Sequence, residues 1–101
     1  MQVLSHKTLK AFWETHPDAE DALTNWFDVV EEADWTTPND VKAAFSTASF
    51  LADNRVVFNI RGNHYRLIVR IAYRYKSVQI KFIGTHAEYD KIDANTIQYE
   101  K

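Results

Sequence analysis

The sequence predicts an α+β fold in which N-terminal helices pack on a C-terminal antiparallel β-sheet. Apolar residues recur with helical spacing up to about residue 45 and with a spacing of two from residue 56 onward. The charge changes at nearly the same place: residues 1–54 carry ten acidic and three basic side chains, whereas residues 55–101 carry four and nine. A chain of 101 residues, 46% of them hydrophobic, has the size of one compact domain, which we assign to residues 1–101.

Three helices are expected in the first half. The first should end near His16, because Pro17 disfavours helical geometry in the residue before it. The same proline suits the first turn of a second helix, whose apolar stripe runs to about Glu32. Thr37 as the N-cap and Pro38 at the first position predict a short third helix over residues 39–45.

The second half should form an antiparallel meander. Residues 56–60 alternate as a first strand, and Gly62 with Asn63 supplies a tight hairpin turn because both tolerate positive φ. Apolar and basic residues then alternate over residues 65–74 in a second strand. After a turn at residues 75–77, a third strand should direct three side chains toward the core: Val78, Ile80 and Phe82.

Composition excludes several classes of function. The chain has no cysteine, which rules out disulfides and thiolate metal sites. Its first residues lack the long apolar run of a signal peptide, and no stretch is long enough to span a bilayer, so a cytoplasmic protein without membrane contact is expected. No P-loop, GxSxG motif or dinucleotide fingerprint is present, and no cofactor is expected.

The basic residues of the second half lie on the predicted sheet with no carboxylate among them. Residues 54–87 hold these cations: Arg55, Arg61, Arg66, Arg70, Arg74, Lys76 and Lys81. A spacing of two puts Arg66, Arg70 and Arg74 on one face of one strand, where Lys81 of the next strand can approach them. Such a row suits the phosphate backbone of RNA. Two alternatives are that these side chains only cover the solvent side of the sheet, or that they dock an acidic protein.

Four residues have the chemistry needed to cut RNA without a metal. The reaction requires a proton acceptor for the 2′-hydroxyl, a proton donor for the leaving 5′-oxygen, and fixed cations for the phosphoryl oxygens. Arg66 is a candidate clamp, and Lys81 can stabilise charge or act as a base if neighbouring cations lower its pKa. His86 is the natural acid or base near neutral pH, and Tyr89 can stack on a base or assist proton transfer.

Other interpretations of the segment around His86 remain open. Thr85 and Glu88 have the spacing of a capping box, in which case His86 is simply a first-turn helical residue. His86, Glu88 and Asp90 alternate as metal ligands on a strand would, but the local signals favour a turn, so no metal site is expected. A non-catalytic RNA- or ribosome-binding module would use the same arginines without needing His86 or Tyr89.

Two segments of the chain resemble the HigB toxins of bacterial type II toxin–antitoxin systems. They are residues 57–68 (VFNIRGNHYRLI) and 81–93 (KFIGTHAEYDKID), and the resemblance extends to residues 35–42 (WTTPNDVK). It implies a RelE-like α+β fold and an mRNA endonuclease that acts mainly on the translating ribosome. It also implies a HigA-like helix-turn-helix antitoxin encoded beside the toxin.

The resemblance also implies which residues carry the function. Arg66, Lys81, His86 and Tyr89 fall at the matching positions, with Arg61 and Asn63 near the substrate. Together with Arg70 and Arg74 from the basic row, these residues make up the predicted catalytic and RNA-binding set.

Overall fold

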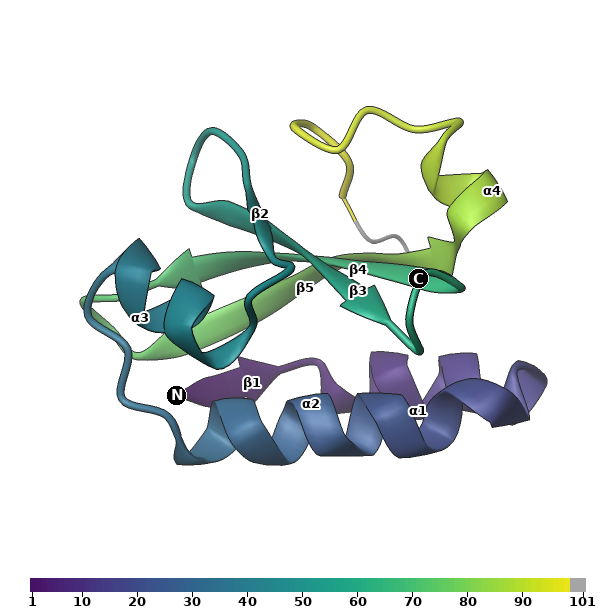
Figure 1. Cartoon of the computed structure of the whole chain (residues 1–101), viewed down its shortest axis with the longest axis horizontal. Helices are drawn as coiled ribbons and strands as arrows, with labels where there is room; N and C mark the ends of the chain where they lie inside the picture. Colours follow the sequence, from purple (N-terminus) through teal and green to yellow (C-terminus); the bar gives the residue numbers. More distant parts are fainter. Residues whose placement is uncertain (99–101) are drawn as a thin grey trace.

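The computed structural model of the chain describes residues 1–98. Its elements, in chain order, are β1 (Gln2–Leu4), α1 (His6–Thr15), the 3₁₀ turn η1 (Pro17–Ala19), α2 (Glu20–Glu32), α3 (Pro38–Ala44), β2 (Ser49–Phe50), β3 (Arg55–Ile60), β4 (Tyr65–Ala72), β5 (Ser77–Thr85) and α4 (His86–Tyr89). Helices α1 and α2 cover one face of the sheet, while α4 and the segment after it lie on the other side (Figure 1). The α+β class is therefore confirmed.

The sheet is mixed rather than antiparallel. Within the described residues its strand order is β1-β5-β4-β3-β2, and β1 pairs with β5 in parallel whereas the other pairs are antiparallel. The prediction missed β1 because three residues are too few to show a period of two. Tertiary contacts hold this strand instead: Val3 is buried, its backbone N–H donates to the Glu31 carboxylate at 2.9 Å, and the N-terminal ammonium donates to the carbonyl of Ala33.

The helix boundaries follow the prolines as predicted. Helix α1 ends at Thr15, just before His16 and Pro17, and α3 begins at Pro38. Thr37 and Asp40 form a capping box at the start of α3. The expected second helix differs at its start, because Pro17 opens a 3₁₀ turn before the α-helical geometry begins at Glu20.

The core lies between the helices and one face of the sheet. Helix α2 contributes Leu23, Trp26 and Val30, all at 1% exposure or less, and α1 contributes Leu9. The Trp26 ring packs edge-on against Phe58 of β3, with 5.5 Å between centroids. Burying each such side chain stabilises the fold by about 1.5–3 kcal/mol. This core fixes which strand residues are left on the opposite face, where the basic side chains lie.

A β-bulge at Lys81 changes the facing of β5. Val69 of β4 pairs with Ile80 and Ile68 pairs with Phe82, so Lys81 is the extra residue between them. Before the bulge, Val78 and Ile80 face the helices. After the bulge, the next residue that faces them is Ile83, which packs against the core. The prediction that Phe82 points inward is therefore wrong, since Phe82 pairs with Ile68 on the other face.

Two turns also differ from prediction. Strand β4 ends at Ala72, so Arg74 lies in the following turn and does not continue a row with Arg66 and Arg70. In the β3–β4 hairpin the positive φ angles belong to Arg61 (52°) and Gly62 (63°), not to Asn63. The four-residue turn leaves the Asn63 side chain free to contact the strand that follows.

Candidate active site

Arg66 is held in place without being neutralised. It lies near the start of β4, and its guanidinium donates to the side-chain oxygen of Asn63 and, at 3.4 Å each, to the carbonyls of Asn63 and Tyr65. Within residues 1–98 it has no carboxylate partner. A half-buried guanidinium with neutral partners keeps its charge available for an anion.

Tyr89 lies next to this guanidinium. The ring of Tyr89, at the end of α4, has its centroid 5.7 Å from the central carbon of the Arg66 guanidinium. This is within the range of a cation–π interaction. Arg66 and Tyr89, 23 positions apart in the sequence, therefore meet because β5 and α4 bring the chain back beside the start of β4.

His86 is the first residue of α4. The Thr85 hydroxyl accepts from the backbone N–H of Glu88 at 3.1 Å, and the Glu88 carboxylate accepts from that of Thr85 at 2.8 Å. The predicted capping box is thus confirmed. The backbone N–H of His86 also donates to the carbonyl of His64 at 3.0 Å, which fastens α4 to the β3–β4 hairpin.

The imidazole of His86 has one ring nitrogen engaged. Its Nδ1 lies 3.2 Å from the Asp90 carboxylate, one helical turn away, and the His86 side chain is 42% exposed. Among the described residues Nε2 has no hydrogen-bond partner. A carboxylate on Nδ1 favours the tautomer in which Nε2 can accept a proton.

Gly84 is a residue that the sequence analysis missed. It pairs with Arg66 across the sheet. A Cβ at this position would lie 2.6 Å from the Phe82 ring and 2.8 Å from the Glu88 carboxylate. Glycine is therefore needed for the capping box to close over the strand. The signal was present in the sequence as a glycine directly before Thr85.

A second group of cations lies further along the same face. Arg70 forms an ion pair with Asp53, with nitrogen–oxygen distances of 3.2 and 3.3 Å. The ammonium of Lys81 donates to the side-chain oxygen of Gln98 at 2.9 Å. The pKa of Lys81 is lowered, first by burial and then by the charges of Arg55 and Arg70. The strand register places these three residues together, because Arg55 pairs with Arg70 and Lys81 lies on the next strand opposite Ile68 and Val69.

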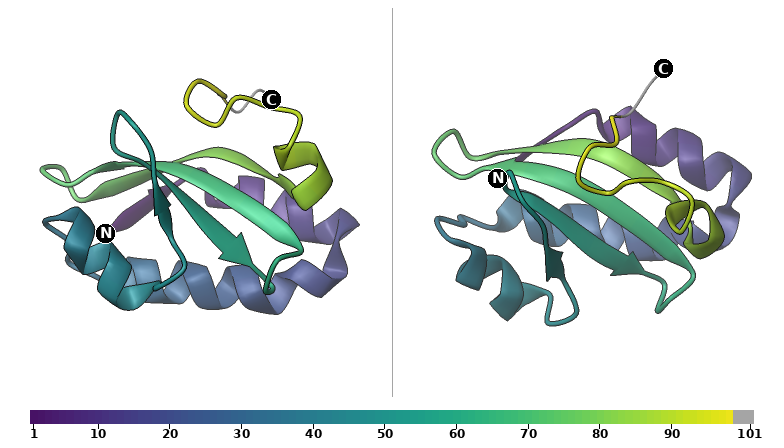
Figure 2. Two further views of the ribbon diagram at one scale, coloured as in Figure 1. Left: turned by 45° about the horizontal axis from the view of Figure 1, so that its top comes forward. Right: turned by 90° about the horizontal axis from the view of Figure 1, so that it is seen from above.

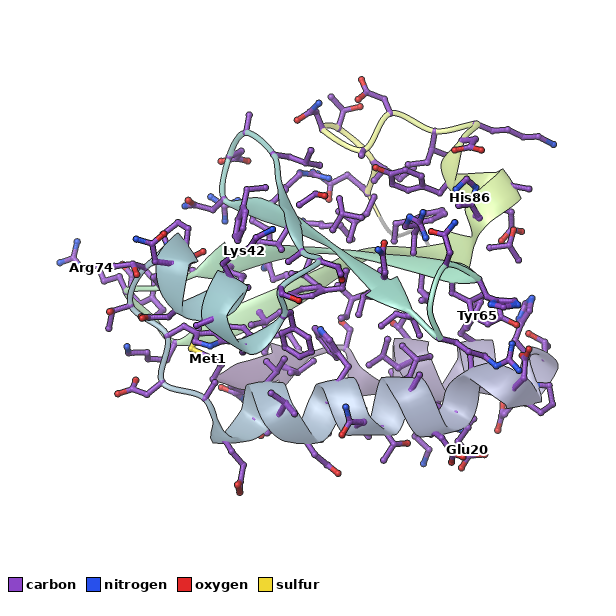
Figure 3. All side chains as sticks on the ribbon, viewed as in Figure 1. Met1, Glu20, Lys42, Tyr65, Arg74 and His86 are labelled. Atoms are coloured by element: carbon purple, nitrogen blue, oxygen red, sulfur yellow. The ribbon has the colours of Figure 1, made fainter. Side chains whose placement is uncertain are left out.

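The remaining predicted contacts have other partners. Arg61 lies 3.6 Å from the carboxylate of Asp18, which also accepts from the hydroxyl of Tyr65. Arg74 stacks at 6.0 Å on the ring of Tyr75. Figure 3 shows Arg74 and His86 at opposite ends of the molecule, whose longest extent is 33 Å. The structure thus brings together Arg66, Asn63 and Tyr89, and places His86 on the same short helix as Tyr89, but it does not bring Arg74 to this group.

Comparison with known proteins decides the family. A family model for HigB toxins, described as the RelE-like toxic component of a toxin–antitoxin system, matches residues 19–92. An mRNA interferase HigB of Escherichia coli O6:H1 is 31% identical over 94 residues, which cover 91% of each chain. The mRNA interferase toxin HigB of Escherichia coli K12 is 26% identical over 92 residues, covering 89% of this chain and 88% of its own.

This chain belongs to the HigB toxin family. The resemblance seen in the sequence is therefore confirmed. The matched range includes every predicted site residue and ends before residues 94–98, which contact Arg55 and Lys81 in this toxin.

Two further features of this HigB-family toxin concern metals and membranes. Within residues 1–98, no group of three or more His, Cys, Asp or Glu side chains is arranged to hold a metal ion. In the same part of the chain, the helices are all too short or too polar to cross a membrane.

Proposed function

We propose that this toxin is a ribosome-dependent mRNA endonuclease with a RelE-like fold, acting in the cytoplasm and inhibiting translation and growth. The observation that carries the proposal is the available guanidinium of Arg66, positioned by Asn63 and lying beside Tyr89 on the helix that presents His86. The names of the relatives, mRNA interferases, support the same reaction.

The reaction we assign is an intramolecular transesterification of RNA, in which the 2′-hydroxyl attacks the adjacent phosphate. The 2′-oxygen attacks phosphorus, the bond to the 5′-oxygen breaks, one proton leaves the 2′-hydroxyl and one reaches the leaving oxygen. Arg66 binds the phosphoryl oxygens where negative charge develops. His86 exchanges a proton through Nε2, the ring nitrogen left free by Asp90. Tyr89 stacks on a base or assists that transfer.

We assign RNA binding rather than reaction to Arg70 and to Lys81, which the sequence analysis counted among the catalytic candidates. Lys81 and Arg70 lie on the same face as Arg66, further along β4 and β5, and hold the charge of the RNA backbone there. Asn63 fixes Arg66, and Arg61 lies in the same hairpin. With so few reactive groups, the site gains most from a ribosome that positions the RNA, because orientation alone can supply several kcal/mol.

Tight induction of the toxin, with mRNA ends mapped by primer extension, tests the site. New ends should appear with the wild type and should fall by about a hundredfold or more with Arg66→Ala and His86→Ala. Arg74→Ala is the matched control, because it removes an arginine at the far end of the molecule and should leave cleavage intact. Arrest of growth without new ends in the wild type would favour the alternative, a non-catalytic RNA- or ribosome-binding module. Soluble Arg66→Ala and His86→Ala variants that cut normally would show that the site is elsewhere.

We also propose that a HigA-like helix-turn-helix antitoxin, encoded beside the toxin, is its partner. Membership of a toxin–antitoxin family supports this proposal. Co-expression of the neighbouring gene should restore growth, and its product should co-purify with the toxin. The ribosome requirement is tested by adding purified toxin to one mRNA, either naked or being translated, and only the translated form should be cut.

A further inference from the structure

Arg55 is a buried cation whose partners in the structure are neutral. It is 3% exposed, and its guanidinium donates to the carbonyls of Ala94 at 3.2 Å and Ile97 at 2.7 Å. Its Nε is buried without a hydrogen-bond partner among residues 1–98. Buried charges are normally paired with an opposite charge, because desolvation costs several kcal/mol per ion. Among residues 1–98, Arg55 is therefore a buried positive charge without a carboxylate partner.

Lys81 and Arg70 add to this charge. Arg55 and Arg70 are partners across β3 and β4, and Lys81 lies in the bulge of β5 opposite Ile68 and Val69 of β4, so the three cations are on neighbouring strands. Burial and the charges of the two arginines lower the pKa of Lys81. Asp53, which pairs with Arg70, is the single carboxylate in contact with the group within the described residues. Lys81 lies on this face because it directly follows Ile80, which faces the core. The bulge then keeps the next residue, Phe82, on the same face.

The segment 94–98 covers these cations with neutral oxygens. Two backbone carbonyls accept from Arg55, and the side-chain amide oxygen of Gln98 accepts from Lys81. The right-hand view of Figure 2 shows this part of the chain lying over β4 and β5. Uncharged oxygens accept hydrogen bonds from these cations but do not neutralise their positive charge. A phosphate would accept the hydrogen bonds and neutralise the charge.

The position of the group fits an RNA strand that passes Arg66. Arg66 and Arg70 lie on the same face of β4, four residues or about 13 Å apart along an extended strand. An RNA backbone bound at Arg66 and running along the sheet would bring a phosphate further along the strand to Arg70 and Lys81.

We propose that Arg55, Arg70 and Lys81 form a second phosphate subsite for RNA, which residues 94–98 cover in the free toxin. The proposal rests on the proposed function and names a subsite within it. When RNA binds, oxygens of a phosphate replace those of Ala94, Ile97 and Gln98, and the C-terminal segment moves off the cations.

A change at Gln98 tests the subsite without touching a cation. Gln98→Glu keeps the shape of the side chain but places a tethered carboxylate on Lys81, where it competes with phosphate. Asn95→Asp is the matched control: it adds the same charge to the same exposed segment, and in the structure only its backbone N–H is engaged, with Asp93 at 3.0 Å. Long-range repulsion of RNA is therefore nearly equal in the two variants.

The readout is binding of a single-stranded 2′-O-methyl RNA, which cannot be cleaved because its 2′-oxygens are blocked. Fluorescence anisotropy at salt concentrations from about 50 to about 200 mM gives the affinity and its salt slope. Gln98→Glu should bind about tenfold more weakly than Asn95→Asp, with a slope smaller by about 0.7 because one phosphate fewer is neutralised. Gln98→Ala removes the cover without adding charge and should bind at least as tightly as the wild type.

Each outcome decides the proposal. Equal affinities for Gln98→Glu and Asn95→Asp, or weaker binding by Gln98→Ala, would show that residues 94–98 do not cover a phosphate subsite. Absence of any RNA binding by the wild type would also overturn the subsite. Primer extension in cells reports separately on cleavage, so a toxin that cuts mRNA but gives equal affinities would refute the subsite and leave the proposed function intact.

Discussion

The arginines outside the core differ in their partners. Arg61 is paired with Asp18, Arg70 with Asp53, and Arg74 with the ring of Tyr75, whereas Arg66 is held by amide and carbonyl oxygens and touches Tyr89. A carboxylate partner reduces the field that a guanidinium presents to a phosphate. At the scale of single residues, Arg66 is therefore the arginine best prepared to bind an anion.

Asp18 predicts a pH-dependent contribution to stability. Its pKa is lowered from 3.8, first by the hydrogen bond from Tyr65 and also by the charge of Arg61. A carboxyl group with a lower pKa in the folded state stabilises the fold above its unfolded pKa, and this contribution is lost as the pH falls through the folded value. Asp18→Asn should therefore lower the melting temperature near pH 7, and the difference from the wild type should shrink below about pH 4.

Thermal unfolding at a series of pH values measures this difference. Asp21→Asn is the control, since Asp21 is an exposed acid of the neighbouring helix α2 without a hydrogen-bond partner in the described chain. A gap between Asp18→Asn and wild type that stays constant down to about pH 3 would contradict the assignment to an ionised Asp18.

At the scale of elements, the sequence predicted those helix ends and strands that depend on neighbouring residues in the chain. The prolines placed the ends of α1 and the start of α3, and the period-two pattern placed β3 and β4. The prediction missed β1 and β2, which have three and two residues, because such short strands show no alternating pattern. They form by pairing with the neighbouring strands. The bulge was missed because residues 78, 80 and 82 alternate as a regular strand would.

For the candidate site, the sequence predicted the residues but not their positions relative to one another. Arg66, His86 and Tyr89 came from side-chain chemistry and family resemblance, but their proximity needed the pairing of β4 with β5. The buried position of Arg55 could not be predicted, since an arginine in an alternating strand is normally assigned to the surface. It is buried because residues 94–98, which carry no strong pattern, pack over it.

The bulge predicts an unusual tolerance to deletion. Removing one residue from a strand normally turns the following side chains to the opposite face. Deleting Lys81 should instead restore regular pairing, because Ile80 already pairs with Val69 and Phe82 with Ile68. The shortened protein should fold with its sheet intact and bind RNA more weakly than the wild type, since it lacks the Lys81 ammonium.

Deletion of Gln79 is the matched control. Gln79 is also in β5 and is exposed, but its loss would turn Val78, which is fully buried, out of the core. This should cost at least about 1.5–3 kcal/mol of stability. Circular dichroism and urea unfolding distinguish the two proteins. If deletion of Lys81 destabilises as much as deletion of Gln79, Lys81 is not the extra residue of the strand.

At the scale of the whole molecule, the sheet separates two surfaces of opposite charge. The exposed side of α2 presents acids and includes a shallow groove lined by Asp28, Val29, Glu32 and Ala33. The opposite face carries Arg66, Arg70 and Lys81. The overall formal charge of −2 therefore conceals a basic face. RNA should meet the sheet side and leave the helical side free.

The salt dependence of RNA binding tests this division. Replacing Arg66, Arg70 and Lys81 with Gln should reduce the slope of log affinity against log salt by about 0.7 for each phosphate that is no longer neutralised. With one phosphate at Arg66 and one at the second subsite, the total reduction should be about 1.4. Replacing Asp21 and Asp28 with Asn and Glu32 with Gln changes charge by the same amount on the far side. Because these acids do not bind phosphate, their replacement should leave the slope unchanged and increase affinity only slightly at low salt, where screening is weak. Changes of slope that are equal in size and opposite in sign in the two triple variants would mean that RNA responds to net charge alone and that the sheet face is not its binding surface.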